Sequence, residues 1–131
     1  MTSTNRSVDA VRRHYDAFAR GDMDAFLATY AEDAVVEHAE SLPFGGAYRG
    51  RDEIGRLVRA FEERWPEAEV TPVQVAASEA WVLVLTRYRG RTASANDVDM
   101  QAVEAFLLDE SAAIARHVIF FFDTQRLREA L

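Results

Sequence analysis

The stretch that decides the fold is IGRLVRAFEERWPEAEVTPVQV, residues 54–75, because the spacing of its apolar residues changes within it. The apolar side chains of its first half have the i, i+3, i+4, i+7, i+11 spacing of one helix face: Ile54, Leu57, Val58, Phe61 and Trp65. Pro66 ends this helix. Beyond it Val73 and Val75 alternate with other residues, which is the period of a strand. We therefore expect a helical half followed by a β half.

Two further helices are expected upstream of this stretch. The first has apolar residues at helical spacing, at Val8, Val11, Tyr15 and Phe18. Gly21 stops it, and Asp22 can cap a shorter second helix. The apolar face of that second helix comprises Met23, Phe26, Leu27 and Tyr30. One short strand, residues 34–38, is expected before the third helix.

Four long strands are expected downstream, joined by short turns. Residues 77–80 form a hairpin turn that leads into WVLVLTRYRG, and a loop over 92–97 leads into VDMQAVEAFLL. A turn over 109–113 leads into IARHVIFFFD, and Leu127 and Leu131 indicate a short closing helix. The order predicts an α+β fold, with an antiparallel sheet packed on three N-terminal helices. We expect one domain, 1–131, with a loose tail over 1–6 and a ligand-sized hollow between sheet and helices.

The composition excludes several classes of chemistry. The 131 residues suit one domain, and the absence of cysteine excludes disulfides, thiolate nucleophiles and cysteine-bound zinc. All 15 basic residues are arginine, so a Schiff base and a P-loop lysine are excluded. A net charge of -7 disfavours nucleic acid. No apolar run spans a membrane and no signal peptide is visible, so we expect a cytoplasmic protein.

Four segments together resemble a known family. They are YDAFARGDMD (15–24), AEDAVV (31–36), LPFGGAYRGR (42–51) and FDT (122–124). The chain resembles the SnoaL-like group of the nuclear-transport-factor-2-like superfamily, which includes ketosteroid isomerase and polyketide cyclase relatives. The resemblance implies a cone of curved sheet around a deep pocket, with helices capping it and a homodimer through the sheet. The superfamily includes isomerases, dehydratases, aldol cyclases, epoxide hydrolases and non-catalytic proteins, so the fold does not choose the reaction.

His38 is the first candidate catalytic residue. The resemblance places it where a ketosteroid-isomerase-like enzyme has an aspartate base, and a histidine is a competent base near neutral pH. Strand alternation puts Ala34, Val36 and His38 on one face. The structural alternative is a histidine at a strand end that hydrogen-bonds the loop 43–46.

Glu104 and His14 are the other candidates for catalysis. Glu104 shares a strand face with apolar residues, so burial is expected to raise its pKa and leave it a protonated hydrogen-bond donor. The resemblance aligns Glu104 with an acidic oxyanion donor and His14 with a donor tyrosine. Alternatively, Glu104 lies on a dimer or solvent face or pairs with Arg116, and His14 is a satisfied, half-buried histidine.

Further residues are expected around the pocket. The expected lining residues are Tyr15, Phe18, Phe44, Phe61, Trp65, Val84, Thr86, Tyr88, Met100, Ala102 and Phe106. Asp123, late in the chain, matches an acid/base residue of SnoaL-like cyclases, although Asp123-Thr124 equally resembles a helix N-cap. His14, His38 and His117 lack the spacing of metal ligands, so we expect neither metal nor cofactor.

The leading hypothesis is a cofactor-free enzyme that acts on a small apolar carbonyl compound. His38 would remove a proton beside the carbonyl, while Glu104 and His14 would donate hydrogen bonds to the enolate oxygen. Isomerisation, aldol cyclisation and dehydration all begin in this way. The alternatives are a non-catalytic binding or structural dimer and, ranked lower, an epoxide hydrolase that would use Asp99 and Arg116.

Overall fold

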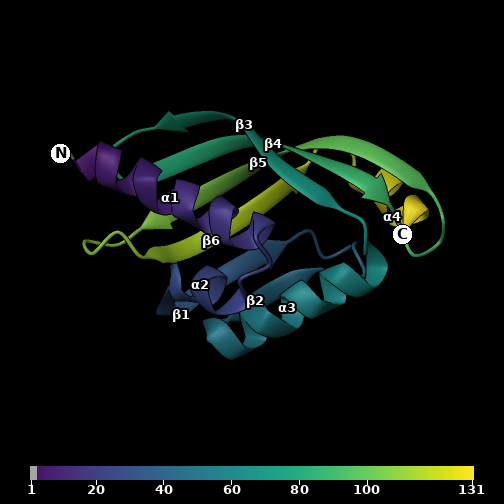
Figure 1. Cartoon of the computed structure of the whole chain (residues 1–131), viewed down its shortest axis with the longest axis horizontal. Coiled ribbons are helices and arrows are strands. Elements are labelled where there is room, and N and C mark those ends of the chain that lie inside the picture. Colours follow the sequence, from purple (N-terminus) through teal and green to yellow (C-terminus); the bar gives the residue numbers. More distant parts are fainter. Residues whose placement is uncertain (1–2) are drawn as a thin grey trace.

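A computed structural model of the chain describes residues 3–131, in which helices and strands surround a single core (Figure 1). The helices are α1 (Ser3–Ala19), α2 (Met23–Ala28), α3 (Gly50–Arg64) and α4 (Thr124–Ala130). The strands are β1 (Tyr30–His38), β2 (Gly46–Arg49), β3 (Glu69–Ala77), β4 (Trp81–Arg91), β5 (Asp97–Leu108) and β6 (Ile114–Phe121). The predicted α+β class, with three helices ahead of the long strands, is confirmed.

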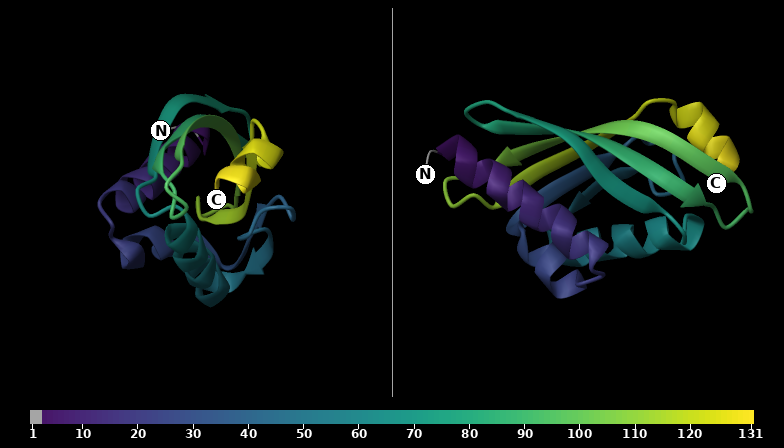
Figure 2. Two further views of the ribbon diagram at one scale, coloured as in Figure 1. Left: turned by 90° about the vertical axis from the view of Figure 1, so that its right-hand side faces the viewer. Right: turned by 45° about the horizontal axis from the view of Figure 1, so that its top comes forward.

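The strands form one curved sheet in the order β2-β1-β6-β5-β4-β3, and Figure 2 shows how it curls. The meander from β3 to β6 is antiparallel throughout, as predicted. The expectation of a wholly antiparallel sheet is wrong in one place, because β1 pairs with β6 in parallel. The sheet is therefore mixed, and its first strand lies beside its last.

Three local differences from the sequence predictions affect the N-terminal half. β1 begins at Tyr30, four residues before the expected strand, and β2 was not predicted. β2 pairs with β1 in an antiparallel hairpin that closes at His38 and Gly46. α1 begins at Ser3, so the expected loose tail is helical from that residue, and residues 1 and 2 lie outside the described residues.

The core lies between the concave face of the sheet and the helices. α3 buries the apolar face that the sequence predicts, including Ile54, Leu57 and Phe61, and it packs along β1, whereas α1 packs along β3. In β4 the buried residues alternate with exposed ones at Val82, Val84, Thr86 and Tyr88. This alternation turns one complete face of each central strand towards the helices.

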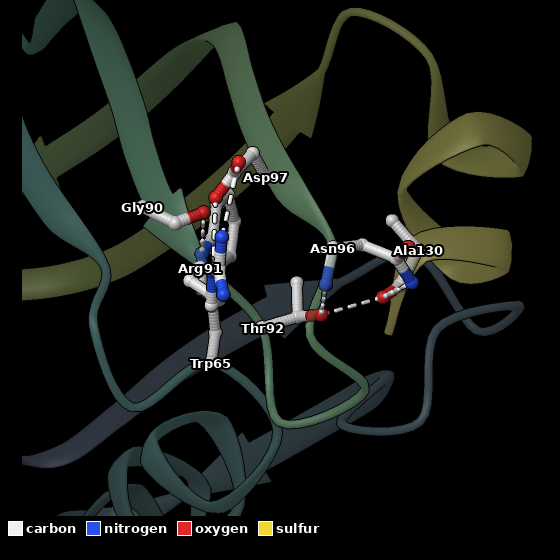
Figure 3. Close-up of polar contacts among 7 residues, drawn as sticks. All are labelled: Trp65, Gly90, Arg91, Thr92, Asn96, Asp97 and Ala130. Atoms are coloured by element: carbon white, nitrogen blue, oxygen red, sulfur yellow. Dashed lines mark hydrogen bonds and ion pairs between the residues drawn. The ribbon is translucent and has the colours of Figure 1, made fainter.

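The β4–β5 loop ties together one end of the molecule (Figure 3). The indole Nε1 of Trp65 donates to the carbonyl oxygen of Gly90 at 3.0 Å. The Thr92 hydroxyl donates to the carbonyl oxygen of Ala130 at 2.8 Å, and the Asn96 side chain donates to the same oxygen at 3.0 Å. The end of β4 thereby anchors the end of α3, and the loop that follows it anchors α4. No helix within residues 3–131 is long and apolar enough to cross a membrane.

Candidate active site

A cavity of about 70 Å³ lies between the helices and the concave face of the sheet. Aromatic and aliphatic side chains form most of its wall. Its polar side chains come from five elements: His14 and Tyr15 of α1, Tyr30 and His38 of β1, Tyr88 of β4, Glu104 of β5 and His117 of β6. Polar groups that converge in an apolar hollow are typical of a small-molecule site.

His38 lies in this cavity on the strand face that its alternation predicts. Val36 lies in the same wall, whereas Glu37, one residue earlier than His38, pairs with Arg116 at 2.9 Å. The His38 ring packs edge-on against Phe44. Its Nδ1 atom is buried and has no hydrogen-bond partner among the described residues. Burial, and secondarily the nearby His117, lowers the pKa of His38 to about 3, so its ring is neutral at pH 7.

Glu104 faces the same cavity as His38, but its hydrogen bonds differ from the prediction. Nε2 of His117 lies 2.6 Å from one carboxylate oxygen, and the Tyr88 hydroxyl donates to the other at 2.8 Å. Burial alone would raise the pKa of Glu104, but the His117 contact and the Tyr88 hydrogen bond outweigh it and hold that pKa below its usual range. The expected protonated donor is therefore wrong, because Glu104 is an ionised acceptor.

The hydrogen bonds continue from His117 to another strand. The Tyr30 hydroxyl lies 2.8 Å from Nδ1 of His117, so the chain runs Tyr30–His117–Glu104–Tyr88 across four strands. Sequence reasoning noticed His117 but gave it no role, and it assigned Tyr30 to a helix face. The missing information was strand pairing: β6 lies between β1 and β5, which brings the three strands' polar residues together.

His14 is a buried histidine with a defined hydrogen-bond partner. Its Nδ1 lies 3.0 Å from the Thr29 hydroxyl, and that hydroxyl donates to the carbonyl oxygen of Phe26 at 2.7 Å. Since the only hydroxyl proton is used there, Nδ1 of His14 is the donor in the first contact. Burial and the neighbouring His117 lower the pKa of His14 well below its usual value. The hydrogen bond of Nδ1 agrees with the structural alternative, but His14 is buried and not half-buried.

Tyr15, the next residue after His14, differs from it in its hydrogen bonding. Its hydroxyl is buried and has no hydrogen-bond partner among the described residues. Burial raises the pKa of Tyr15 far above its ordinary value, and the negative charge of Glu104 raises it further. Tyr15 is therefore a neutral hydroxyl in the cavity wall, near Glu104 but without a well-formed hydrogen bond among the described residues.

The other predicted lining residues divide into two groups. Phe18 and Phe61 line the cavity together with Tyr15 and Tyr88. The remaining seven lie in the core around it and not in its wall: Phe44, Trp65, Val84, Thr86, Met100, Ala102 and Phe106. Phe106 shows the reason, because its ring stacks on His117 at a centroid distance of 4.1 Å and supports the polar chain from behind.

Asp123 and the residues considered for epoxide hydrolysis lie elsewhere. Asp123 accepts a hydrogen bond from the backbone N–H of Arg126 at 3.0 Å, so it is the N-cap of α4. The side chain of Asp99 binds Arg87, and both are exposed. Arg116 binds Glu37, so Asp99 and Arg116 do not meet around the cavity. Within residues 3–131 no three acidic or histidine side chains are grouped to hold a metal ion.

Solved structures with the same fold support the architecture. An NTF2-like protein of unknown function from Burkholderia pseudomallei K96243 matches with a TM-score of 0.90 and 22% identity, over 99% of this chain and 98% of that one. A protein from Jannaschia sp. CCS1, proposed to be a SnoaL-like polyketide cyclase, matches with a TM-score of 0.86 and 19% identity, over 99% and 94%. TerC, co-crystallised with polyporic acid, matches with a TM-score of 0.86 and 16% identity, over 95% and 97%.

The sequence comparison agrees with the structural one. No curated protein matches the chain. The profile of the SnoaL-like domain matches residues 11–117, which are most of the chain and include all seven polar residues of the cavity. The chain belongs to the SnoaL-like domain family, within the NTF2-like fold.

Proposed function

We propose that the cavity binds a small, largely apolar carbonyl compound and transfers a proton beside its carbonyl group without a cofactor. One observation carries this proposal. Within residues 3–131 only two buried side-chain polar atoms lack a partner, the Tyr15 hydroxyl and Nδ1 of His38, and both residues line the cavity. An unsatisfied buried polar group costs roughly 1–3 kcal/mol. A ligand with complementary polar atoms would remove that cost.

Tyr15 is the hydrogen-bond donor to the carbonyl oxygen in this proposal. Its raised pKa keeps the hydroxyl protonated at every physiological pH, and within residues 3–131 the hydroxyl makes no well-formed hydrogen bond, although Glu104 lies near enough to raise its pKa. A neutral donor held in an apolar cavity stabilises the negative charge that develops on an enolate oxygen. This role replaces the one that the sequence suggested for Glu104.

His38 is the proton acceptor. The C–H bond beside the carbonyl breaks, its proton joins the imidazole, and its electron pair moves into the C–C bond as the carbonyl oxygen becomes an enolate oxygen. His38 then returns the proton at another position of the substrate, which completes an isomerisation. A pKa of about 3 makes His38 a weak base. It also ensures that the ring is unprotonated and ready at neutral pH.

Glu104 supports His38 through its charge. The ionised carboxylate raises the pKa of His38, although burial has the larger opposite effect. When His38 takes the substrate proton, the same charge stabilises the imidazolium. His117 keeps Glu104 ionised through their short contact. In this arrangement His14 positions the cavity wall through its bond to Thr29.

A ligand-binding protein without catalysis is the second candidate function. The chain Tyr30–His117–Glu104–Tyr88 is closed within the protein, as in a purely structural network. A weakly basic His38 fits this reading as well. TerC, which shares the fold, was co-crystallised with the small molecule polyporic acid. Both candidate functions accordingly involve a small-molecule ligand.

Deuterium exchange separates the two candidates without knowledge of the natural substrate. The α-hydrogens of cyclohexanone and 3-cyclohexenone would be followed by NMR in D₂O with and without the protein. We expect the protein to accelerate exchange, and His38→Ala to abolish that acceleration. Tyr15→Phe should slow exchange by about 10²–10³-fold, the usual effect of removing one oxyanion donor.

The matched control is Val35→Ala, which changes the same strand on the face opposite His38. It should leave exchange unchanged. Ketones that stabilise the protein against thermal unfolding while their α-hydrogens do not exchange would support the binding function and contradict the catalytic one. Exchange that persists in His38→Ala would remove His38 from the mechanism.

A further inference from the structure

A second hollow adjoins the cavity. The groove between α1 and β3 has a volume of about 590 Å³. Tyr15 and Val70 line both the groove and the cavity. Because the same two side chains face both spaces, they form the partition between them.

The two hollows differ greatly in size. The cavity, at about 70 Å³, exceeds the roughly 10–15 Å³ that one water molecule needs, but it is far below the 300–1,000 Å³ of pockets that enclose drug-sized ligands. The cavity therefore fits the reacting end of a molecule better than a whole polycyclic one. The rest of a larger ligand would need space outside it, and the groove supplies that space at the partition.

The chemistry of the groove suits an apolar chain. Val73 and Val75 on β3 contribute apolar surface, and Val73 is 50% exposed. Arg12 and Asp16, one turn apart on α1, border the same hollow with charges of opposite sign. An apolar floor with a polar border is the usual form of a surface that binds an apolar ligand.

The groove is a poor place for a further strand. β3 is the edge strand of the sheet, and an edge can pair with another chain. Its pairing register shifts between Pro72 and Gln74, and proline at position 72 has no N–H to donate. Both features oppose strand addition, so an apolar tail is the occupant that this surface favours.

We propose that the substrate is an elongated molecule whose carbonyl end enters the cavity and whose unbranched apolar tail lies in the groove between α1 and β3. The tail would leave the cavity beside Tyr15 and Val70, the two side chains that face both hollows, which places the carbonyl end near the Tyr15 hydroxyl. This inference rests on the proposed function for the role of the carbonyl, but the groove binds the tail whether or not chemistry follows.

The test is a chain-length series. Dissociation constants of methyl alkyl ketones from 2-butanone to 2-nonanone would be measured by calorimetry, together with those of the matching 2-alkanols, which have no carbonyl and do not enolise. In the wild-type protein we expect affinity to rise about two- to fourfold with each added methylene, because each leaves water for an apolar surface. Affinity that stays level beyond 2-butanone would overturn the proposal, and this result needs no variant.

Two variants localise the effect. Val73→Asp places a charge in the groove and not in the cavity. It should therefore weaken the binding of 2-nonanone by at least tenfold and leave the affinity for 2-butanone unchanged. The matched control is Ala76→Asp, which adds the same charge to an exposed residue of the same strand outside the groove. It should behave as the wild type. Equal effects of the two substitutions would contradict the groove as the binding surface.

The outcomes for the two proposals are distinct. If the alcohols and ketones bind more tightly with length but no α-hydrogen exchanges, the proposed catalysis fails and the extended site stands. If 2-butanone exchanges but longer ketones bind no better, the catalysis stands and the extended site fails.

Discussion

Nε2 of His117 lies 2.6 Å from a carboxylate oxygen of Glu104, and both side chains are almost wholly buried. The two residues come from adjacent strands, in which Phe106 of β5 faces His117 of β6. Glu104 and His117 are therefore diagonal neighbours on the two strands. This places the N–H of His117 against a carboxylate that would otherwise be buried in an apolar core without this partner. This pair sets the charge of the cavity.

Replacing one member of this pair should destabilise the protein strongly. His117→Ala leaves the Glu104 carboxylate buried without its main partner, and the expected loss in the free energy of unfolding is about 3–5 kcal/mol. Urea unfolding followed by circular dichroism measures it. In the double variant His117→Ala/Glu104→Leu the loss should be smaller than the sum of the single losses, because the buried charge is gone. Additive losses would show that the two residues do not interact.

Stability should fall as the pH drops below neutral. In the folded protein the pKa of His38 is lowered to about 3, while its unfolded value is about 6.5. Between these values the unfolded chain binds more protons, so stability is full above pH 6.5 and declines towards pH 3, with a slope approaching about 1.4 kcal/mol per pH unit from this residue. His14 and Glu104, whose pKa values are also lowered, act with the same sign, Glu104 at lower pH.

The matched variant for this pH dependence is His38→Gln, which removes one titrating group. Urea unfolding at pH 7, 6, 5 and 4.5 should give a shallower decline for this variant than for the wild type. Identical slopes would mean that His38 is not held neutral by burial.

The sequence predicts the fold correctly where the spacing of apolar residues follows one clear period. The helical spacing from Ile54 to Trp65 and the alternation around Glu104 both depend on residues close in the chain, and the structure confirms them. The parallel pairing of β1 with β6 depends on residues about 80 positions apart, for which no local signal exists. The strand β2 was missed because its four residues are too few for a periodic pattern.

The site could be predicted only in part, because local sequence patterns do not show which strands pair. Alternation grouped His38 and Glu104 each with apolar residues on one strand face and left open which way the face of Glu104 points; both line one cavity. The ionisation of Glu104 could not be foreseen, since it depends on His117, which the sheet brings close to it. Thr86 was expected in the cavity wall, but its hydroxyl donates to the carbonyl oxygen of Ala102, and it is buried beneath that wall.

The pH profile of catalysis should differ from that of a solvent-exposed histidine. Because burial holds the pKa of His38 near 3, the ring remains a competent proton acceptor throughout pH 5–8. We expect kcat/KM for α-deuterium exchange to be level over that range. A decline centred near pH 6.5, the ordinary histidine value, would show that the base is not His38 with its lowered pKa.

Gly90 should tolerate alanine far less well than Gly21 does. Its φ of +151° is rare for other residues, and an added Cβ would overlap the carbonyl oxygen of Glu67. Gly21 provides the control, since its φ of +68° is also positive but nothing lies within 4 Å of the added atom. Gly21→Ala should cost about 1–2 kcal/mol of unfolding free energy through backbone strain alone. Gly90→Ala should cost more by urea unfolding, and an equal or smaller loss would contradict the overlap.

The protein should form a homodimer through the outer face of its sheet. Leu83, Val103 and Phe120 lie on the three central strands with their side chains 40–58% exposed, and Val103 pairs directly with Phe120. An exposed apolar patch on a sheet is typical of an interaction surface. Phe120→Asp should convert the protein to monomers in sedimentation velocity experiments, because two buried copies of the new charge would face the same patch. Val73→Asp, equally polar but on the edge strand, should remain dimeric. A monomeric wild-type protein at micromolar concentration would refute this interface.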